Sequence, residues 1–103
     1  MYLYNTSFHA DSSVAETFIA WLKTIFIPEA MSSGLFSEAS LGKILLEIEP
    51  GTSSYTLQFK ARELDRAREW NDTIGNSLRS VIVKKFGGKV VFFVIFIEII
   101  DHE

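Results

Sequence analysis

The stretch that decides the fold is residues 90–100, which read VVFFVIFIEII. Eight apolar residues follow one another before an acidic residue interrupts them, and such a run of Val, Ile and Phe is typical of a β-strand. Successive side chains of a strand point to opposite faces, so Phe92 and Phe96 lie on one face and Phe93 lies on the other. Both faces of this strand are apolar, and we predict that both are covered.

Three further strands are predicted upstream of this segment. Alternating or β-branched apolar residues indicate strands over residues 2–9, 37–49 and 55–61, with the Ile and Leu of the second concentrated in residues 41–49. Pro50 and Gly51 lie between the second and third of these strands, and residues of this kind form turns. The second and third strands are therefore predicted to form a β-hairpin.

Two helices are predicted, over residues 13–27 and 63–86. Ser13 followed by Glu16 matches a capping box, which favours a helix start at Ser13. Pro28 disfavours helical geometry in the residue before it, so we expect a break or kink near Ile27. Gly75 is a poor helix former, and we expect a second break or kink between residues 74 and 77.

The apolar side chains of each helix recur at helical spacing, which predicts the buried face. In the first helix this stripe consists of Val14, Phe18, Trp21, Leu22 and Ile25. In the second helix it consists of Leu64, Ala67, Asn71, Ile74 and Leu78. Trp70 lies off the second stripe, so it is expected to be exposed and to be a candidate contact residue.

The order strand, helix, strand, strand, helix, strand predicts an α+β fold, a ferredoxin-like βαββαβ two-layer sandwich with a four-stranded antiparallel sheet. Residues 1–103 are expected to form a single domain. Both helices then cover one face of the sheet, and the last strand lies at an edge with its other face open. A homodimer that pairs the two sheets would cover that open face.

Composition excludes several classes of protein and of site. The 103 residues contain 10 Lys and Arg, 13 Asp and Glu, and no Cys, with a formal charge of −3. Without cysteine, disulfides, thiol nucleophiles and thiolate metal sites are impossible, and a reducing cytoplasm is the expected location. The acidic balance argues against nucleic acid as a partner, and an apolar run of eight is too short to span a membrane.

No arrangement of acid–base residues indicates catalysis. The two histidines, His9 and His102, are not spaced as a metal site, and no catalytic residue, metal ligand or cofactor is predicted. Glu47 and Glu49 would lie roughly 6.6 Å apart on one strand face, which fits a carboxylate pair. A solvated strand face is the preferred interpretation of that pair.

Candidate binding residues come from the aromatic and polar side chains near the first helix. If the protein binds a small apolar molecule, the site is expected between the sheet and that helix, lined by Tyr4, Trp21 and Glu29. The residues predicted to face a second copy in the dimer are Asn5, His9, Phe92 and Phe96.

Several short segments carry a resemblance to a known family. They are the start MYLYN, WLK at residues 21–23 running into IPE at 27–29, GLF at 34–36, and FG at 86–87. With these segments the chain resembles a small bacterial family, domain of unknown function family 4286. The resemblance implies a ferredoxin-like protomer similar to the dimeric α/β-barrel proteins, with no established activity. Relatives tend to carry a His immediately before the IPE segment, whereas this chain has Phe26, so an acid–base role at that position is absent here.

Two functions of different classes remain open. The favoured one is a non-catalytic homodimeric domain that binds a protein or a small apolar molecule. The alternative is a cofactor-independent oxygenase or isomerase of the dimeric α/β-barrel type. An enclosed apolar pocket with converging polar groups, between the sheet and the helices, would favour the enzyme, and a filled interior would favour the binding domain.

Overall fold

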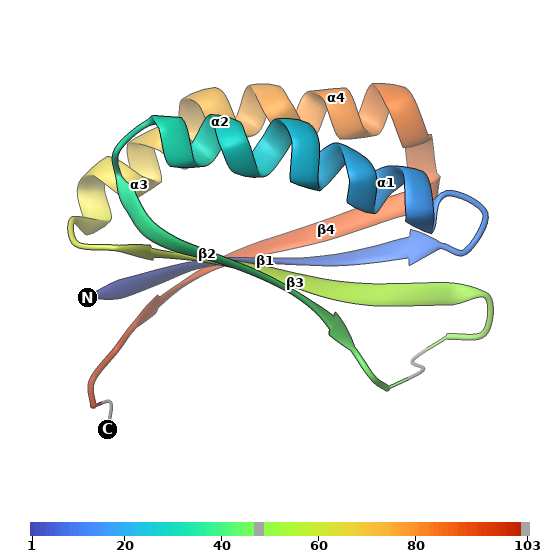
Figure 1. The fold of residues 1–103 in the computed structure, drawn as a ribbon, viewed down its shortest axis with the longest axis horizontal. Coiled ribbons are helices and arrows are strands. Elements are labelled where there is room, and N and C mark those ends of the chain that lie inside the picture. The colour runs from blue at the N-terminus through green and yellow to red at the C-terminus, as the bar shows by residue number, and fades with distance from the viewer. Residues whose placement is uncertain (47–48, 102–103) are drawn as a thin grey trace.

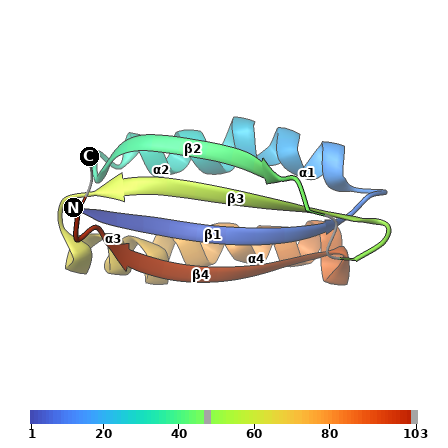
Figure 2. The same cartoon turned by 90° about the horizontal axis from the view of Figure 1, so that it is seen from below.

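A computed structural model describes residues 1–46 and 49–101 of the chain. Its strands form one four-stranded sheet in the order β2-β3-β1-β4, with every neighbouring pair antiparallel (Figure 2). The strands are β1 (Tyr2–Asp11), β2 (Phe36–Ile44), β3 (Thr52–Ala61) and β4 (Val90–Glu98). The predicted hairpin between β2 and β3 is confirmed, and β4 is an edge strand as predicted.

The helices form a second layer on one face of the sheet (Figure 1). The first comprises α1 (Ala15–Trp21), the π-helical turn η1 (Leu22–Phe26) and α2 (Ile27–Ser32). The second comprises α3 (Leu64–Trp70), the π-helical turn η2 (Asn71–Gly75) and α4 (Asn76–Phe86), and a short 3₁₀ turn η3 (Gly87–Lys89) leads into β4. This is the predicted ferredoxin-like βαββαβ sandwich. No helix in the described part of the chain has the length and hydropathy needed to cross a membrane.

Aromatic rings fill the space between the two layers. Tyr4 lies opposite Phe59 of β3 and Phe96 of β4 in the sheet, and its ring stacks on Phe96 at 4.9 Å between centroids. Phe36 and Trp70 lie 5.7 and 5.9 Å from the same ring. Tyr4 is therefore enclosed on several sides by other rings, and it has no exposed surface.

The predicted capping box at Ser13 does not form. The Asp11 carboxylate instead accepts hydrogen bonds from both the backbone N–H and the hydroxyl of Ser13, at 2.9 and 2.7 Å. Asp residues readily hold a turn of this kind two residues ahead. Helix α1 therefore begins at Ala15, after a turn held by Asp11.

Neither helix breaks at the positions where a break or kink was predicted, near Ile27 and Gly75, because each helix continues through a π turn. The N–H of Ile27 bonds to the carbonyl of Leu22, five residues back, and Pro28, which has no N–H to donate, comes directly after this widened hydrogen bond. Gly75 has ordinary helical angles, φ −58° and ψ −43°. Gly75 is therefore the last residue of one π turn, and Pro28 lies two residues after the end of the other.

The two helices repeat one another, which the sequence analysis did not detect. Each begins with seven α-helical residues that end in Trp, followed by five π-helical residues. The shared pattern is Trp-x-x-Thr-Ile, at residues 21–25 and 70–74. Thr24 and Thr73 each donate a hydrogen bond to the carbonyl four residues back, at 2.8 and 2.7 Å. The two βαβ halves therefore share one helix geometry.

Candidate interaction surface

The face of the sheet opposite the helices carries an exposed apolar strip along β4. We call it the β4 stripe, and it consists of Val91, Phe93, Ile95 and Ile97. Val91, Phe93 and Ile95 are 47%, 62% and 51% exposed. The helices lie on the far side of the sheet, so nothing in the described part of the chain covers these side chains (Figure 2). Contiguous apolar surface of this kind marks an interaction site.

The centre of the same face is polar. The Asn5 amide oxygen accepts a hydrogen bond from the Thr56 hydroxyl at 2.7 Å, and the His9 Nδ1 is hydrogen-bonded to the Ser54 hydroxyl at 2.7 Å. His9 also lies edge-on to Phe93, at 6.2 Å between ring centroids. His9 therefore marks the border between the polar centre and the β4 stripe.

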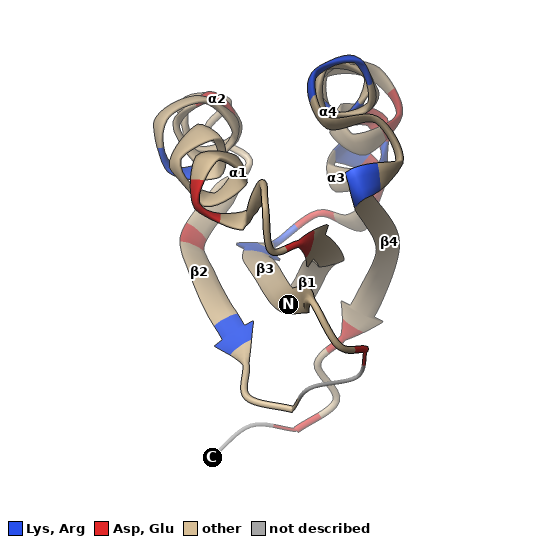
Figure 3. Cartoon of the chain, turned by 90° about the vertical axis from the view of Figure 1, so that its right-hand side faces the viewer, with Lys and Arg blue, Asp and Glu red and all other residues tan. Residues whose placement is uncertain are grey.

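The two edge strands, β2 and β4, differ in how well they are protected against pairing with a strand of another molecule. The pairing of β2 with β3 is irregular between Phe36 and Ala39, and β2 carries Glu38 and Lys43. Strand β4 pairs regularly with β1 along its length and has no charged residue before Glu98; Figure 3 shows this contrast between the two outer strands. Irregular pairing and charge discourage a further strand or sheet from adding to an edge. Only β2 has that protection.

The structure divides the four residues predicted to face a second copy. Asn5 and His9 lie on the open face, on the strand next to β4. Phe92 and Phe96 lie on the helix face, where Phe96 stacks on Tyr4 and Phe92 lies 6.5 Å from Phe8. Their assignment to an open dimer face is therefore corrected. The open face of β4 carries Phe93 and Ile95 instead.

The three residues predicted to line a ligand site are not assembled into one. Tyr4 and Trp21 are buried, and the Trp21 ring packs on Phe26 at 6.1 Å. Glu29 is exposed in the first turn of α2. A ligand between the sheet and the first helix would have to displace these core rings. Trp70, expected on the surface, is also buried, within 6.0 Å of the Phe26 ring.

A buried polar cluster lies between β1 and the second helix, and the sequence analysis missed it. The Arg79 guanidinium donates to the Tyr4 hydroxyl at 2.9 Å and to the Asn71 carbonyl at 2.8 Å. The Tyr4 hydroxyl donates to the Asn71 side-chain oxygen at 2.7 Å. We call these three residues the Arg79 cluster. No carboxylate in the described residues lies within ion-pair distance of Arg79.

Burial raises the pKa of the Tyr4 phenol above its ordinary value, and the neighbouring Arg79 charge offsets part of that rise. The phenol is therefore protonated at neutral pH and acts as both acceptor and donor in the Arg79 cluster. One signal for this cluster was present in the sequence. Arg79 falls four residues after Gly75, and small residues in helices leave room for a long side chain nearby.

The sequence profile of a family described as "Domain of unknown function (DUF4286)" matches residues 1–100. The chain belongs to this family. Two crystal structures of dimeric ferredoxin-like proteins from an uncultured marine organism resemble the DUF4286 chain, each at 12% identity. The first has a TM-score of 0.70 and covers 100% of this chain and 98% of its own. The second has a TM-score of 0.63, with 99% and 98% coverage, and no curated protein matches the chain.

The position at which this DUF4286 chain departs from its expected relatives lies in the core. Phe26 is fully buried in η1, and its ring lies 6.4 Å from Phe59. Of the two residues of the possible carboxylate pair, Glu47 lies outside the described residues and Glu49 lies in a bend after β2. His102 likewise lies outside the described residues. No group of three or more His, Asp or Glu side chains in residues 1–46 and 49–101 is arranged to hold a metal ion.

Proposed function

We propose that this DUF4286 chain works as a homodimeric interaction domain, in which the β4 stripe packs against the same stripe of a second copy. The exposed Phe93 between Val91 and Ile95 carries this proposal. The unprotected edge of β4 supports it, because a long regular strand with two apolar faces is an aggregation hazard unless a partner covers it. The description of the two similar folds as dimeric gives further support.

Two-fold symmetry explains why a second copy suits this face. In a two-fold interface the same patch occurs on both subunits, so the patch must complement itself. Packing the β4 stripe on itself places apolar side chains against apolar side chains. It also leaves the charged Lys60 and Glu38, which pair at 2.6 Å on the β2 side of the face, outside the apolar contact.

The dimer is tested by replacing Phe93 with Glu. A carboxylate at the centre of an apolar interface loses its hydration without gaining a partner, so the variant is expected to be monomeric. Analytical ultracentrifugation of the wild type and of Phe93→Glu at micromolar concentration measures this. The far-ultraviolet circular dichroism spectrum should be unchanged, because Phe93 is exposed within one protomer.

Val83→Glu is the matched control for this test. Val83 is an exposed apolar residue of similar accessibility, on α4 in the other layer. The same charge placed there should leave the dimer intact. A wild-type chain that sediments as a monomer would contradict the proposal, and so would equal dissociation by both variants.

We also propose a single domain over residues 1–103 and a cytoplasmic location. One core shared by both helices and all four strands supports the first. The lack of cysteine supports the second, because reducing compartments do not use disulfides.

A further inference from the structure

A groove runs along α3 at the end of the molecule where β2 begins. It consists of two adjoining hollows of about 510 and 330 Å³, and Leu35 and Arg66 line both. Both volumes fall in the range of small-molecule sites. We call this feature the α3 groove. It is separate from the β4 stripe, since no residue of that stripe lines either hollow.

One end of the α3 groove is cationic. Lys60, Arg62 and Arg66 line the first hollow together with Glu63, and Lys60 is already paired with Glu38, so Arg62 and Arg66 are the cations left for a ligand. Glu63 pairs with Arg66 through one contact of 3.2 Å, and both side chains are mostly exposed, so this pair is weak. A guanidinium has five N–H donors and suits a carboxylate with two parallel hydrogen bonds. Arg66 therefore keeps donors for an external anion.

The other end of the α3 groove is mixed in character. Leu35 and Ile74 give it an apolar wall, with Ile74 43% exposed, and Ser33, Glu69 and Thr73 also line this second hollow. Trp70 also lines it, and its indole N–H is buried without a hydrogen-bond partner among the described residues. Buried side-chain donors are almost always paired, and because this N–H is itself buried it is not open to a molecule in the hollow.

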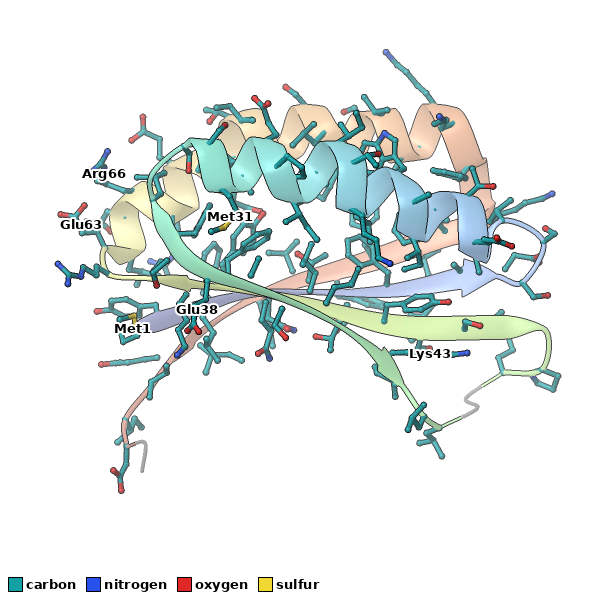
Figure 4. All side chains as sticks on the ribbon, in the orientation of Figure 1. Met1, Met31, Glu38, Lys43, Glu63 and Arg66 are labelled. Carbon is teal, nitrogen blue, oxygen red and sulfur yellow. The ribbon has the colours of Figure 1, made fainter. Side chains whose placement is uncertain are left out.

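We propose that the α3 groove binds a small organic anion with an apolar body. Its carboxylate pairs with Arg66 and Arg62, and its hydrocarbon chain lies over Leu35 and Ile74. Glu63 pairs with Arg66 in the absence of the anion, and Figure 4 places these two side chains next to each other at the start of α3. The anion and Glu63 therefore compete for the same guanidinium.

Titration of the ¹⁵N-labelled protein with octanoate tests this site. The indole N–H signal of Trp70 reports on the groove, and the signal of Trp21, in the first helix, is an internal reference. The Trp70 signal is expected to shift saturably, with a dissociation constant on the order of 1 mM for a ligand of this size. Octylammonium, which has the same chain and the opposite charge, should not shift the Trp70 signal.

Two charge changes should act in opposite directions. Arg66→Gln removes the main carboxylate partner, so octanoate should bind about tenfold more weakly. Glu63→Gln removes the competitor, so octanoate should bind several-fold more tightly. The matched controls are Lys84→Gln and Glu16→Gln, which make the same charge changes at exposed positions outside the groove and should leave binding unchanged.

Three results would overturn the proposal. The Trp70 shift could fail to saturate, or octylammonium could shift the signal as much as octanoate does. The control variants could also change the affinity for octanoate as much as the groove variants with the same charge change. Because Phe93 lies outside the groove, the titration gives the same answer in the Phe93→Glu variant. Failure of the dimer proposal and failure of this one are therefore distinguishable.

Discussion

Tyr4→Phe is expected to lower the free energy of unfolding by about 2–4 kcal/mol, although it removes a single oxygen atom. That oxygen accepts from the Arg79 guanidinium and donates to the Asn71 side chain. Its loss leaves the buried Arg79 charge with one partner fewer and removes the Tyr4 donor from the half-buried Asn71 amide oxygen. Chemical denaturation followed by tryptophan fluorescence measures the change.

Two comparisons separate the Arg79 cluster from a general effect of losing a phenol. Tyr2→Phe, on the same strand but only half-buried, should change stability by less than about 0.5 kcal/mol. The double variant Tyr4→Phe with Arg79→Met should be more stable than Tyr4→Phe alone, because it also removes the uncompensated charge. A Tyr4→Phe variant as stable as Tyr2→Phe would show that the cluster contributes little.

The raised pKa of Tyr4 adds a pH dependence with a definite sign. A phenol whose pKa is higher in the folded state binds its proton more tightly there than in the unfolded chain. Its contribution is fully present below pH 10, the ordinary value, and is lost as the pH rises through the folded pKa. Above pH 10 the wild type should therefore lose stability more steeply than Tyr4→Phe.

Gly75→Ala is expected to destabilise the protein by about 1–3 kcal/mol, whereas in an open helix the same change stabilises. A Cβ atom at Gly75 would lie 3.1 Å from Arg79 Nη1, 3.1 Å from Trp70 Cζ3 and 3.2 Å from the Tyr4 oxygen. Hydrogen bonds hold two of these neighbours, and packed rings hold the third. Moving any of these three neighbours away from the new Cβ atom would therefore cost free energy.

Gly42→Ala is the matched control for Gly75→Ala. A Cβ atom at Gly42 would meet only Thr56 Cγ2, at an ordinary contact distance of 3.8 Å. Its melting temperature should stay within a few degrees of the wild-type value. A higher melting temperature for Gly75→Ala than for the wild type would mean that the neighbours do give way.

The sequence predicted the topology well because period-two and helical patterns report on faces of strands and helices. It predicted the buried stripe of the first helix correctly only up to the π turn, and in the second helix it also placed the buried Trp70 on the surface. Ile25 and Ile74 were placed in the core and are 47% and 43% exposed, whereas the next residue of each helix, Phe26 or Gly75, is buried. A π turn adds one residue, so every later position moves round the helix by about 100°. Ordinary helical spacing cannot anticipate that shift.

The candidate surface was predicted less completely than the fold. Alternation along residues 90–97 separated Phe92 and Phe96 from Phe93 and Ile95, but it could not tell which set faces the helices. Register decides that question, because Phe96 lies opposite Tyr4, and Tyr4 belongs to the core. The α3 groove could not be predicted at all, since it brings together a loop before β2 and the exposed side of α3.

The repeated Trp-x-x-Thr-Ile segments have a consequence for how the two halves could diverge. The last residue of each π turn is Phe26 in one helix and Gly75 in the other, and four residues later the equivalent positions hold Ala30 and Arg79. In the first half, the Phe26 ring fills the core beside the π turn. In the second half, the Arg79 guanidinium fills the equivalent space and needs specific oxygen partners. Exchanging the two helix segments would preserve the course of the backbone, but the exchanged side chains would no longer match their partners in the core. The two halves therefore share a main-chain geometry without sharing a core packing.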